Sequence, residues 1–168
     1  MTTEAAKLVT FRLADDLFAA DIFSVERVLR YQSPRSLPDV PAWIEGVIEY
    51  QQRVIPVVNL RRRFELPERE AVAETRIVVL NARGEWIGIV VDSVVEVSTV
   101  EAAQISPAPG FFRGLAGEYL KGILRRAQGE RLVIVLDVEQ LLRAAERIVL
   151  QLGSARGTPI VGGAVVDA

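Results

Sequence analysis

Three aspartates, Asp21, Asp92 and Asp137, are the residues of this sequence that could form a catalytic set of carboxylates. Carboxylates that meet in a pocket can act as general acid and general base. Each of these aspartates, however, stands at the end of an expected strand or at the start of an expected helix, where a carboxylate commonly accepts backbone N–H groups. We therefore predict that all three stabilise the local backbone and do not form an active site.

The sequence lacks the residues that activate a nucleophile or bind a transition metal. It contains no histidine and no cysteine, so neither an imidazole base nor a thiolate is available. Ser24, Ser93 and Ser106 therefore have no histidine to activate them, and the glycines of residues 110–117 do not have the spacing of a phosphate-binding loop. These observations predict a protein with no enzymatic activity, no cofactor and no metal ion.

Arginines form two clusters, at Arg61–Arg63 and Arg125–Arg126, that could contact a nucleic acid. Small β-barrels do bind single strands through basic grooves lined with aromatic side chains. Here the aromatic residues do not interleave with the arginines, and the net charge of the 168-residue chain is −2. We expect the first cluster to lie on a helix face exposed to water. A nucleic-acid-binding barrel is the alternative from another functional class.

The composition is that of an ordinary folded domain, with 50% apolar and 25% charged residues. No apolar run approaches the length of a membrane-spanning helix, and the first residues, MTTEAAKL, lack the apolar stretch of a signal peptide. We therefore expect a cytoplasmic protein.

Short apolar runs, several of them with a two-residue period, predict strands throughout the chain. In its first part we expect strands at residues 8–13, 17–22 and 24–30 and a hairpin of residues 46–50 and 54–58. Asn59 can then cap a short helix at residues 60–64.

The polar segment Leu66–Thr75 is predicted to be a linker or loop, and similar elements follow it. We expect strands at residues 77–80, 86–91 and 94–100 and a second hairpin of residues 119–124 and 132–136. From Val138 the apolar positions have a helical period, at Leu141, Leu142, Ala145, Ile148 and Leu152, before Gly153 ends the pattern.

These elements form an internal repeat. Residues 8–28 align without a gap with residues 77–97, which lie 69 positions later, and the two hairpins then align in the same order. A strand-rich unit of this length closes naturally as a five-stranded barrel. We therefore predict a mostly β protein of two pseudo-repeated five-stranded barrels of the SH3 or OB type, followed by a C-terminal helix.

The predicted domain spans residues 7–150, with halves at about residues 8–64 and 77–142. The sequence leaves open whether the two halves exchange strands. We expect residues 151–168, which are small, apolar and rich in glycine, to form a flexible tail.

Several blocks of the sequence resemble the CheW family of chemotaxis coupling proteins. The matching blocks are Phe11-Arg12-Leu13 with Asp21-Ile22, Leu37–Pro41, Gly46-Val47-Ile48, Val54–Arg61, Gly88–Asp92 with Glu96-Val97, Ile105–Pro109 and Tyr119–Ile123. They occur in order over about residues 7–150. The resemblance implies two five-stranded barrels that share a third hydrophobic core, and it implies no enzymatic activity.

The resemblance also implies a function. Proteins of this family link the cytoplasmic tips of chemoreceptors to the regulatory domain of the histidine kinase CheA. We therefore expect a cytoplasmic adaptor that is recruited to membrane receptor arrays and has no nucleic acid partner. A CheW-like decoy that binds the kinase but no receptor is a second alternative. The sequence identifies neither the cognate receptor and kinase nor the output of the pathway.

By resemblance, the receptor-binding surface is expected in a groove between the barrels. Its expected residues are Ile22, Val25, Arg27, Val28, Gln51, Val54, Val91, Val94 and Val97. An apolar groove of this kind could hold a receptor helix. The valines fit a plain core equally well, and the sequence does not decide between the two.

Two positions in this set depart from the family pattern. Arg27 stands where the family commonly has Glu, and Gln51 stands where it commonly has Arg. The family associates both positions with receptor binding, so we expect an altered receptor preference. Asn59 replaces the usual Asp, and Gln52 replaces a Gly, which costs about 1 kcal/mol if the turn needs a positive φ.

Overall fold

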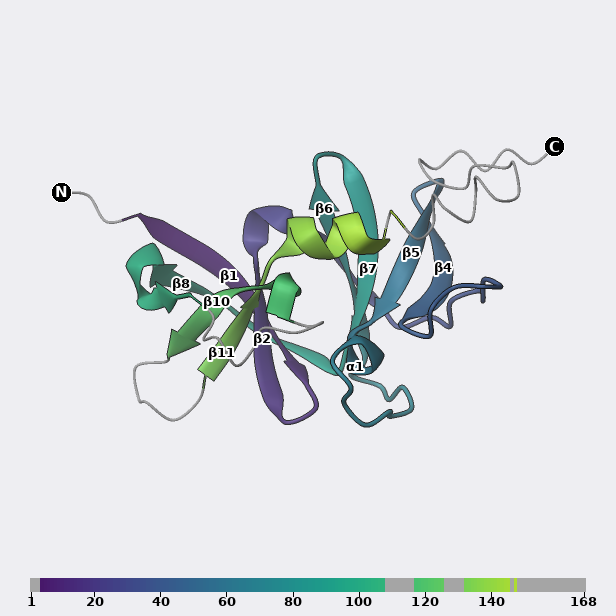
Figure 1. Cartoon of the computed structure of the whole chain (residues 1–168), viewed down its shortest axis with the longest axis horizontal. Coiled ribbons are helices and arrows are strands. Elements are labelled where there is room, and N and C mark those ends of the chain that lie inside the picture. The colour runs from purple at the N-terminus through teal and green to yellow at the C-terminus, as the bar shows by residue number, and fades with distance from the viewer. Residues whose placement is uncertain (1–3, 108–116, 126–131, 146, 148–168) are drawn as a thin grey trace.

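The computed structural model describes residues 4–107, 117–125, 132–145 and 147. Its short strands form two groups that lie side by side (Figure 1). The strands are β1 (Ala5–Leu13), β2 (Asp16–Asp21), β3 (Val25–Arg30), β4 (Ile44–Tyr50), β5 (Arg53–Asn59), β6 (Arg76–Ala82), β7 (Glu85–Val91), β8 (Ser93–Glu101), β9 (Ile105–Ser106), β10 (Leu120–Arg125) and β11 (Leu132–Leu136). The helical elements are η1 (Ile22–Ser24), α1 (Leu60–Arg63), η2 (Ala102–Gln104), η4 (Gly117–Tyr119) and a C-terminal helix over residues 138–145.

The strands form one six-stranded sheet, in the order β8-β1-β2-β11-β10-β9, and one five-stranded sheet, in the order β3-β6-β7-β5-β4. We call them the six-stranded lobe and the five-stranded lobe. Neighbouring strands are antiparallel except for the parallel pairs β2–β11 and β5–β7. The predicted mostly β fold is confirmed. One sheet has an additional strand because the two-residue β9 pairs with β10.

The internal repeat relates the two lobes to each other. Under the sequence alignment, β1, β2, β3 and β5 of the first half correspond to β6, β7, β8 and β11 of the second. In the five-stranded lobe β6 pairs with β3 and β7 with β5; in the six-stranded lobe β1 pairs with β8 and β2 with β11. The leading hairpin of each half therefore lies in the lobe that contains the later strands of the other half.

Two glycines at equivalent positions of the repeat allow a close backbone approach. A Cβ on Gly46 would collide with the carbonyl oxygen of Arg35, and a Cβ on Gly122 would collide with that of Ser106. Arg35 exchanges two backbone hydrogen bonds with Val47, at 2.8 and 2.9 Å. The segments that precede the two hairpins can thus pair with them because these positions carry no side chain.

The hydrophobic interior is divided into three cores. One small core lies inside the six-stranded lobe and includes Leu8, Leu17 and Val133; the other lies inside the five-stranded lobe and includes Ile55, Ile77 and Val79. The largest core uses the opposite faces of the exchanged hairpins: Phe11, Leu13, Phe18 and Ala20 of β1–β2, with Val78, Leu80, Ile87, Ile89 and Val91 of β6–β7. We call it the central core, and it matches the third core that the resemblance implied.

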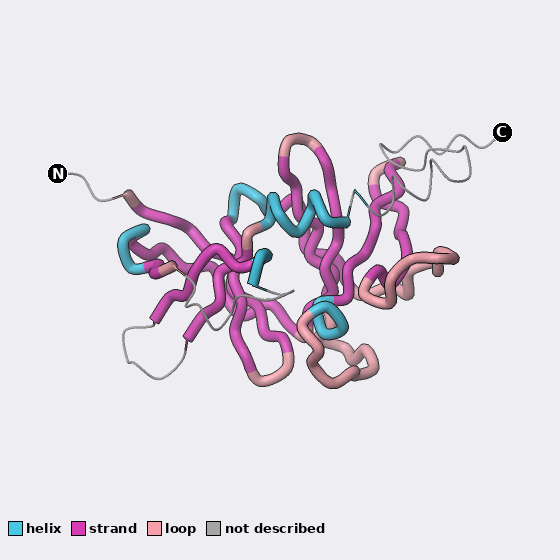
Figure 2. Tube along the Cα trace, viewed as in Figure 1, coloured by secondary structure: helices cyan, strands magenta, loops and turns pink. Residues whose placement is uncertain are grey.

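Helices cover the central core (Figure 2). The C-terminal helix buries Val138, Leu141, Leu142 and Ala145 in it, and α1 buries Leu60. The helical pattern predicted from Val138 is thus confirmed as far as residue 145, while Ile148, Leu152 and Gly153 lie outside the described residues.

Candidate docking surface

The edge strands β3 and β8 carry corresponding valines on either side of the central core. Val25 of β3 and Val94 of β8 are half-buried and pack against that core. They are equivalent in the repeat, since residue 25 plus 69 is residue 94. Each precedes a break in register, between Val25 and Arg27 in β3 and opposite Thr10/Phe11 in β8. A β-bulge of this kind re-aims the following side chains.

Beyond these two valines, Val28 of β3 and Val97 of β8 emerge into solvent, and Val95, the unpaired residue of the β8 bulge, is exposed as well. Val28 is 38% exposed and its equivalent Val97 is 56% exposed. Val28 pairs across the sheet with Val78, a central-core residue, and Val97 pairs with the buried Val9. Cross-strand partners share a face of the sheet, so both exposed valines extend the faces that form the central core.

We call Val25, Val28, Val94 and Val97 the valine face. Each strand contributes one half-buried valine on the central core and one exposed valine beyond it, so Val25 and Val94 belong to a core. Val91, at the end of β7, is fully buried in the central core, against which Val25 and Val94 also pack. Ile22 lies half-buried in η1, three residues before Val25.

Arg27 and Glu96 lie on the other face of the same two strands. Arg27 pairs with Val79, which belongs to the core inside the five-stranded lobe, and Glu96 pairs with the buried Thr10. These two charged residues are equivalent in the repeat and carry opposite charges. The structure therefore separates Arg27 from the valine face, although the sequence places it next to Val28.

Gln51 and Val54 lie at the tip of the β4–β5 hairpin. Arg53, in the same hairpin, donates to the carbonyl oxygen of Gly84 at 2.8 Å, which puts this tip beside the β6–β7 turn. Val91 stands at the far end of β7, six residues and roughly 20 Å from that turn. The predicted groove residues are thus divided between the valine face and the hairpin tip.

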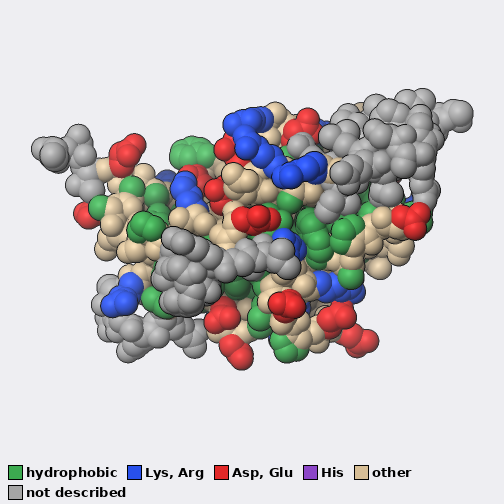
Figure 3. Space-filling view, viewed as in Figure 1, with side chains coloured by type: hydrophobic (Ala, Val, Ile, Leu, Met, Phe, Trp, Pro, Cys, Tyr) green, Lys and Arg blue, Asp and Glu red, His purple; other side chains and the backbone are tan. Residues whose placement is uncertain are grey.

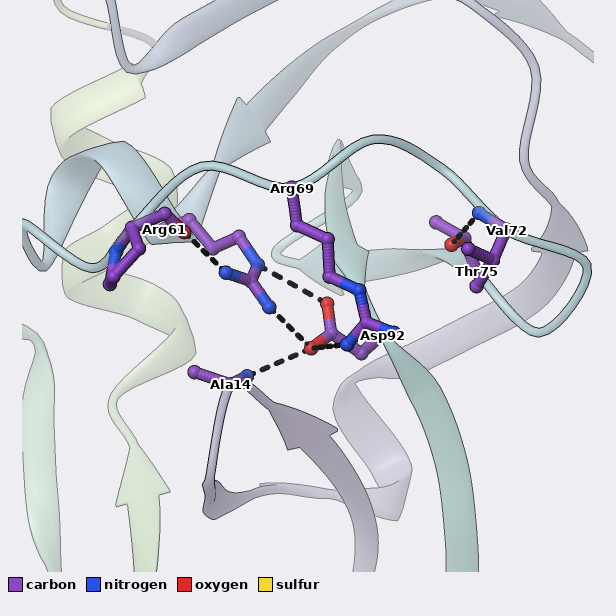
Figure 4. Close-up of polar contacts among 7 residues, drawn as sticks. Ala14, Arg61, Arg69, Val72, Thr75 and Asp92 are labelled. Atoms are coloured by element: carbon purple, nitrogen blue, oxygen red, sulfur yellow. Dashed lines mark hydrogen bonds and ion pairs between the residues drawn. The ribbon is translucent and has the colours of Figure 1, made fainter.

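The β7–β8 corner beside the valine face is held by a network around Asp92 (Figure 4). Arg61 of α1 binds both carboxylate oxygens, with Nη2 to Oδ2 at 2.7 Å and Nε to Oδ1 at 3.3 Å. The N–H of Ala14, in the β1–β2 turn, also donates to Oδ2 at 2.9 Å, and Arg69 lies 3.9 Å away. One carboxylate therefore joins three separate segments to the corner from which β8 starts.

The prediction that the arginines of α1 face water is wrong for Arg61 and Arg63. The side chain of Arg61 is 11% exposed and that of Arg63 is 10% exposed, whereas Arg62 is 35% exposed. Burial of a guanidinium requires charged or hydrogen-bonding partners, and these come from segments distant in sequence. A four-residue helix gave no periodicity from which these buried positions could have been recognised.

Arg63 lies between two aromatic rings that are equivalent in the repeat. Its guanidinium carbon is 5.2 Å from the ring centre of Trp43 and 4.6 Å from that of Tyr119, and Nη2 donates to the Tyr119 hydroxyl at 2.8 Å. Burial raises the pKa of Tyr119, against the opposing effect of Arg63. Trp43 precedes β4 and Tyr119 precedes β10, so this arginine connects the two lobes.

Asn59 is also explained by its contacts. Its Oδ1 accepts from the backbone N–H of Arg62 at 3.0 Å, which confirms the predicted cap, and its Nδ2 donates to Glu45 at 2.9 Å. Tyr31 donates to the other oxygen of Glu45, and burial together with this carboxylate raises the pKa of Tyr31 to about 12. An aspartate at position 59 would place a second carboxylate against Glu45, so the amide suits this neighbour better.

The remaining aspartates act as the sequence predicts. Asp21 accepts from the N–H of Phe23 at 2.9 Å, and Asp137 accepts from that of Gln140 at 3.1 Å. Within the described residues, no group of His, Cys, Asp and Glu side chains could hold a metal ion. Acidic and basic side chains are interspersed on the face drawn in Figure 3. In the described part of the chain, no helix has the length and apolar character needed to cross a membrane.

A family model described as the CheW-like domain matches residues 7–146 of the chain. The chain is 34% identical over 149 residues to the chemotaxis protein CheW of Treponema pallidum, with 85% of each chain covered. It is 34% identical over 144 residues to the chemotaxis protein CheW of Klebsiella aerogenes, with 86% of each covered.

A solved structure is similar over most of its length. It is the crystal structure of the scaffolding protein TtCheW from Thermoanaerobacter tengcongensis, with a TM-score of 0.72 and 30% sequence identity. The match covers 79% of this chain and 89% of that one.

Proposed function

Because this chain belongs to the CheW-like family of non-enzymatic chemotaxis scaffolds, we propose that it couples chemoreceptors to a CheA-type histidine kinase. The observation that carries the proposal is the valine face, where β3 and β8 each present an exposed valine next to the central core. Exposed apolar side chains on two edge strands can contact the apolar side of a helix. We assign it to the cytoplasmic tip of a receptor, and the protein would work in the cytoplasm at receptor arrays.

The kinase would bind a different part of the surface, so that both partners are held at once. In the family, the regulatory domain of CheA has the same two-barrel fold, and the blocks Val54–Leu60 and Gly88–Asp92 are kept here apart from Asn59. We expect a dissociation constant in the micromolar range or tighter, about −8 kcal/mol. Two modest interfaces joined in one assembly raise the local concentration of each partner for the other.

The receptor assignment is tested by placing a charge on the valine face. The double variant Val28→Glu with Val97→Glu should lose about tenfold or more in affinity for the cognate receptor tip, because each carboxylate would be buried against an apolar helix. Kinase binding should be unchanged. Leu132→Glu is the control, since Leu132 is 48% exposed but lies on β11. Titration calorimetry measures receptor binding and kinase binding for the parent, the double variant and the Leu132→Glu control. Unchanged receptor affinity in the double variant would contradict the assignment.

The family resemblance assigns receptor choice to Arg27 and Gln51, which lie outside the valine face and would contact another part of the receptor tip. A receptor tip that matches the usual acidic residue would present a basic group to Arg27, and this like-charge contact would cost several kcal/mol of binding free energy. The same tip would lose its charge-assisted hydrogen bond at Gln51, which is worth about 1.5–3 kcal/mol. The protein should therefore prefer a receptor whose tip is altered to match. The double variant Arg27→Glu with Gln51→Arg should bind a standard tip more tightly and the cognate tip less tightly. Equal binding of parent and variant to both tips would show that these positions do not set specificity.

A further inference from the structure

Neither half of the chain contains a complete sheet. The β1–β2 hairpin of the first half is flanked by β8 and β11 of the second, and the β6–β7 hairpin of the second half is flanked by β3 and β5 of the first. The hydrogen bonds that complete each lobe therefore run between the halves. The arrangement is that of two copies of one unit that have exchanged their leading hairpins.

The central core and several polar contacts also join one half to the other. Phe11 and Phe18 of the first half share the central core with Leu80 and Ile87 of the second. The bidentate pair of Arg61 with Asp92, and the contact of Arg63 with Tyr119, likewise cross from half to half. Each half would expose these apolar and charged groups without the other.

The chain passes from the first half to the second through residues 64–75, the connecting loop. Its first residues, Phe64 and Leu66, pack against the central core, and the Phe64 ring lies 5.5 Å from that of Phe18, which belongs to the same half. After them, Glu68 pairs with Arg62 at 2.8 Å, the carbonyl oxygen of Pro67 accepts from Arg61, and Arg69 lies 3.9 Å from Asp92. Residues 68–74 are exposed. Opening this loop would break few interactions compared with the sheets and cores on either side.

We propose that a second copy of this chain can supply the missing half. Residues 4–63 of each copy would pair with residues 76–145 of the other, giving a strand-exchanged dimer with two complete pairs of lobes. The contacts within the lobes would be the same in the dimer as in the monomer. The equilibrium between monomer and dimer therefore depends on the conformation of the connecting loop and on protein concentration. A short flexible linker holds the tethered half at an effective concentration of about a millimolar, which favours the monomer in dilute solution.

This dimer would change how the docking surface is built. Val25 and Val28 would come from one copy and Val94 and Val97 from the other, so each dimer would carry two valine faces, both made of two chains. The proposal concerns the assembly of the chain and does not depend on the partners proposed above.

The test uses an ion pair that crosses between the halves. In the variants R61D and D92R, like charges meet in the monomer, so each should be strongly destabilised. When the two variants are unfolded together and refolded at high concentration, a strand-exchanged heterodimer contains one native pair and one reversed pair. We expect the mixture to yield about tenfold more folded dimer on size-exclusion chromatography than either variant alone, together with a higher melting temperature.

The matched control is the pair of Arg83 with Glu139, at 2.9 Å, because both residues lie in the second half. R83D mixed with E139R should give no gain in dimer, since residues 83 and 139 of one chain stay together in its second half and exchange cannot pair one substitution with the other. A second variant lacks residues 68–73, so that its connecting loop has six residues in place of twelve. The shorter loop should disfavour closure within one chain and give more dimer than the parent at the same concentration. A deletion variant with no more dimer than the parent, or no gain from mixing R61D with D92R, would overturn the proposal.

Discussion

At the scale of single residues, three aspartates that look alike in the sequence act in different ways. Asp21 and Asp137 accept backbone N–H groups next to them in sequence, as their positions predict. Asp92 instead binds Arg61, 31 positions away, and the N–H of Ala14, 78 positions away. The first role depends on local backbone geometry and the second on tertiary contact.

The ion pair between Asp92 and Arg61 should matter for stability. Asp92→Asn removes the negative charge and leaves the largely buried guanidinium of Arg61 without its partner, so we expect a loss of about 3 kcal/mol in the free energy of unfolding. Urea denaturation measures this loss. Glu68→Gln is the control, because Glu68 is 66% exposed and pairs with the more exposed Arg62. It should cost about 1 kcal/mol or less. Equal effects of the two substitutions would contradict this account.

At the scale of elements, the β4–β5 turn has a backbone conformation that its two glutamines adopt only at a steric cost. Gln51 and Gln52 both have positive φ, at 50° and 64°, as a two-residue type I′ turn requires. The neighbouring β6–β7 turn, also of two residues, has Arg83 and Gly84 at φ of 56° and 82°. Glycine adopts this conformation without steric cost and glutamine does not, so the first turn is the more strained of the two.

Gln52→Gly should therefore stabilise the protein by about 1 kcal/mol. The β6–β7 turn provides the opposite control: Gly84→Ala should destabilise by a similar amount through φ alone, because a Cβ there would meet no atom within 4 Å. Thermal and urea unfolding of both variants measure these changes. A neutral or destabilising Gln52→Gly would show that the glutamine side chains make compensating contacts.

At the scale of the whole molecule, the two lobes depend on each other. They share the central core, and Arg63 reaches from α1 to the aromatic residues that precede β4 and β10. Its equivalent in the repeat, Leu141, is fully buried in the same core. The two halves have thus diverged at this position of the repeat, where the first half has Arg63 and the second has Leu141.

Arg63→Ala should remove both ring contacts and the hydrogen bond to Tyr119, with an expected loss of about 3 kcal/mol in the free energy of unfolding. Because this contact joins the lobes, amide hydrogen exchange should increase in β4 and β10 together. Arg62→Ala, which affects a more exposed arginine of the same helix, should cost about 1 kcal/mol or less. Increased exchange in only one of the two strands would argue against a role in joining the lobes.

Much of this molecule could be predicted from the sequence alone. The alternation of Val9, Phe11 and Leu13, the two hairpins and the helical period from Val138 all correspond to elements of the structure. These signals are local, since a strand or helix shows its buried face as a period of two or about three and a half residues. The duplication and the resemblance could be found for the same reason, because both are properties of the order of residues.

Tertiary structure decided which strands meet and what the side chains face. The pattern of a strand shows that it pairs but not with which strand, so the exchange of hairpins between lobes could not be deduced from it. The burial of Arg61 and Arg63 depends on Asp92, Trp43 and Tyr119, which are distant in sequence. Adjacent residues of a strand point to opposite faces. Only the register of β3 against β6 therefore placed Val28 on the docking surface and Arg27 on the other side of the sheet.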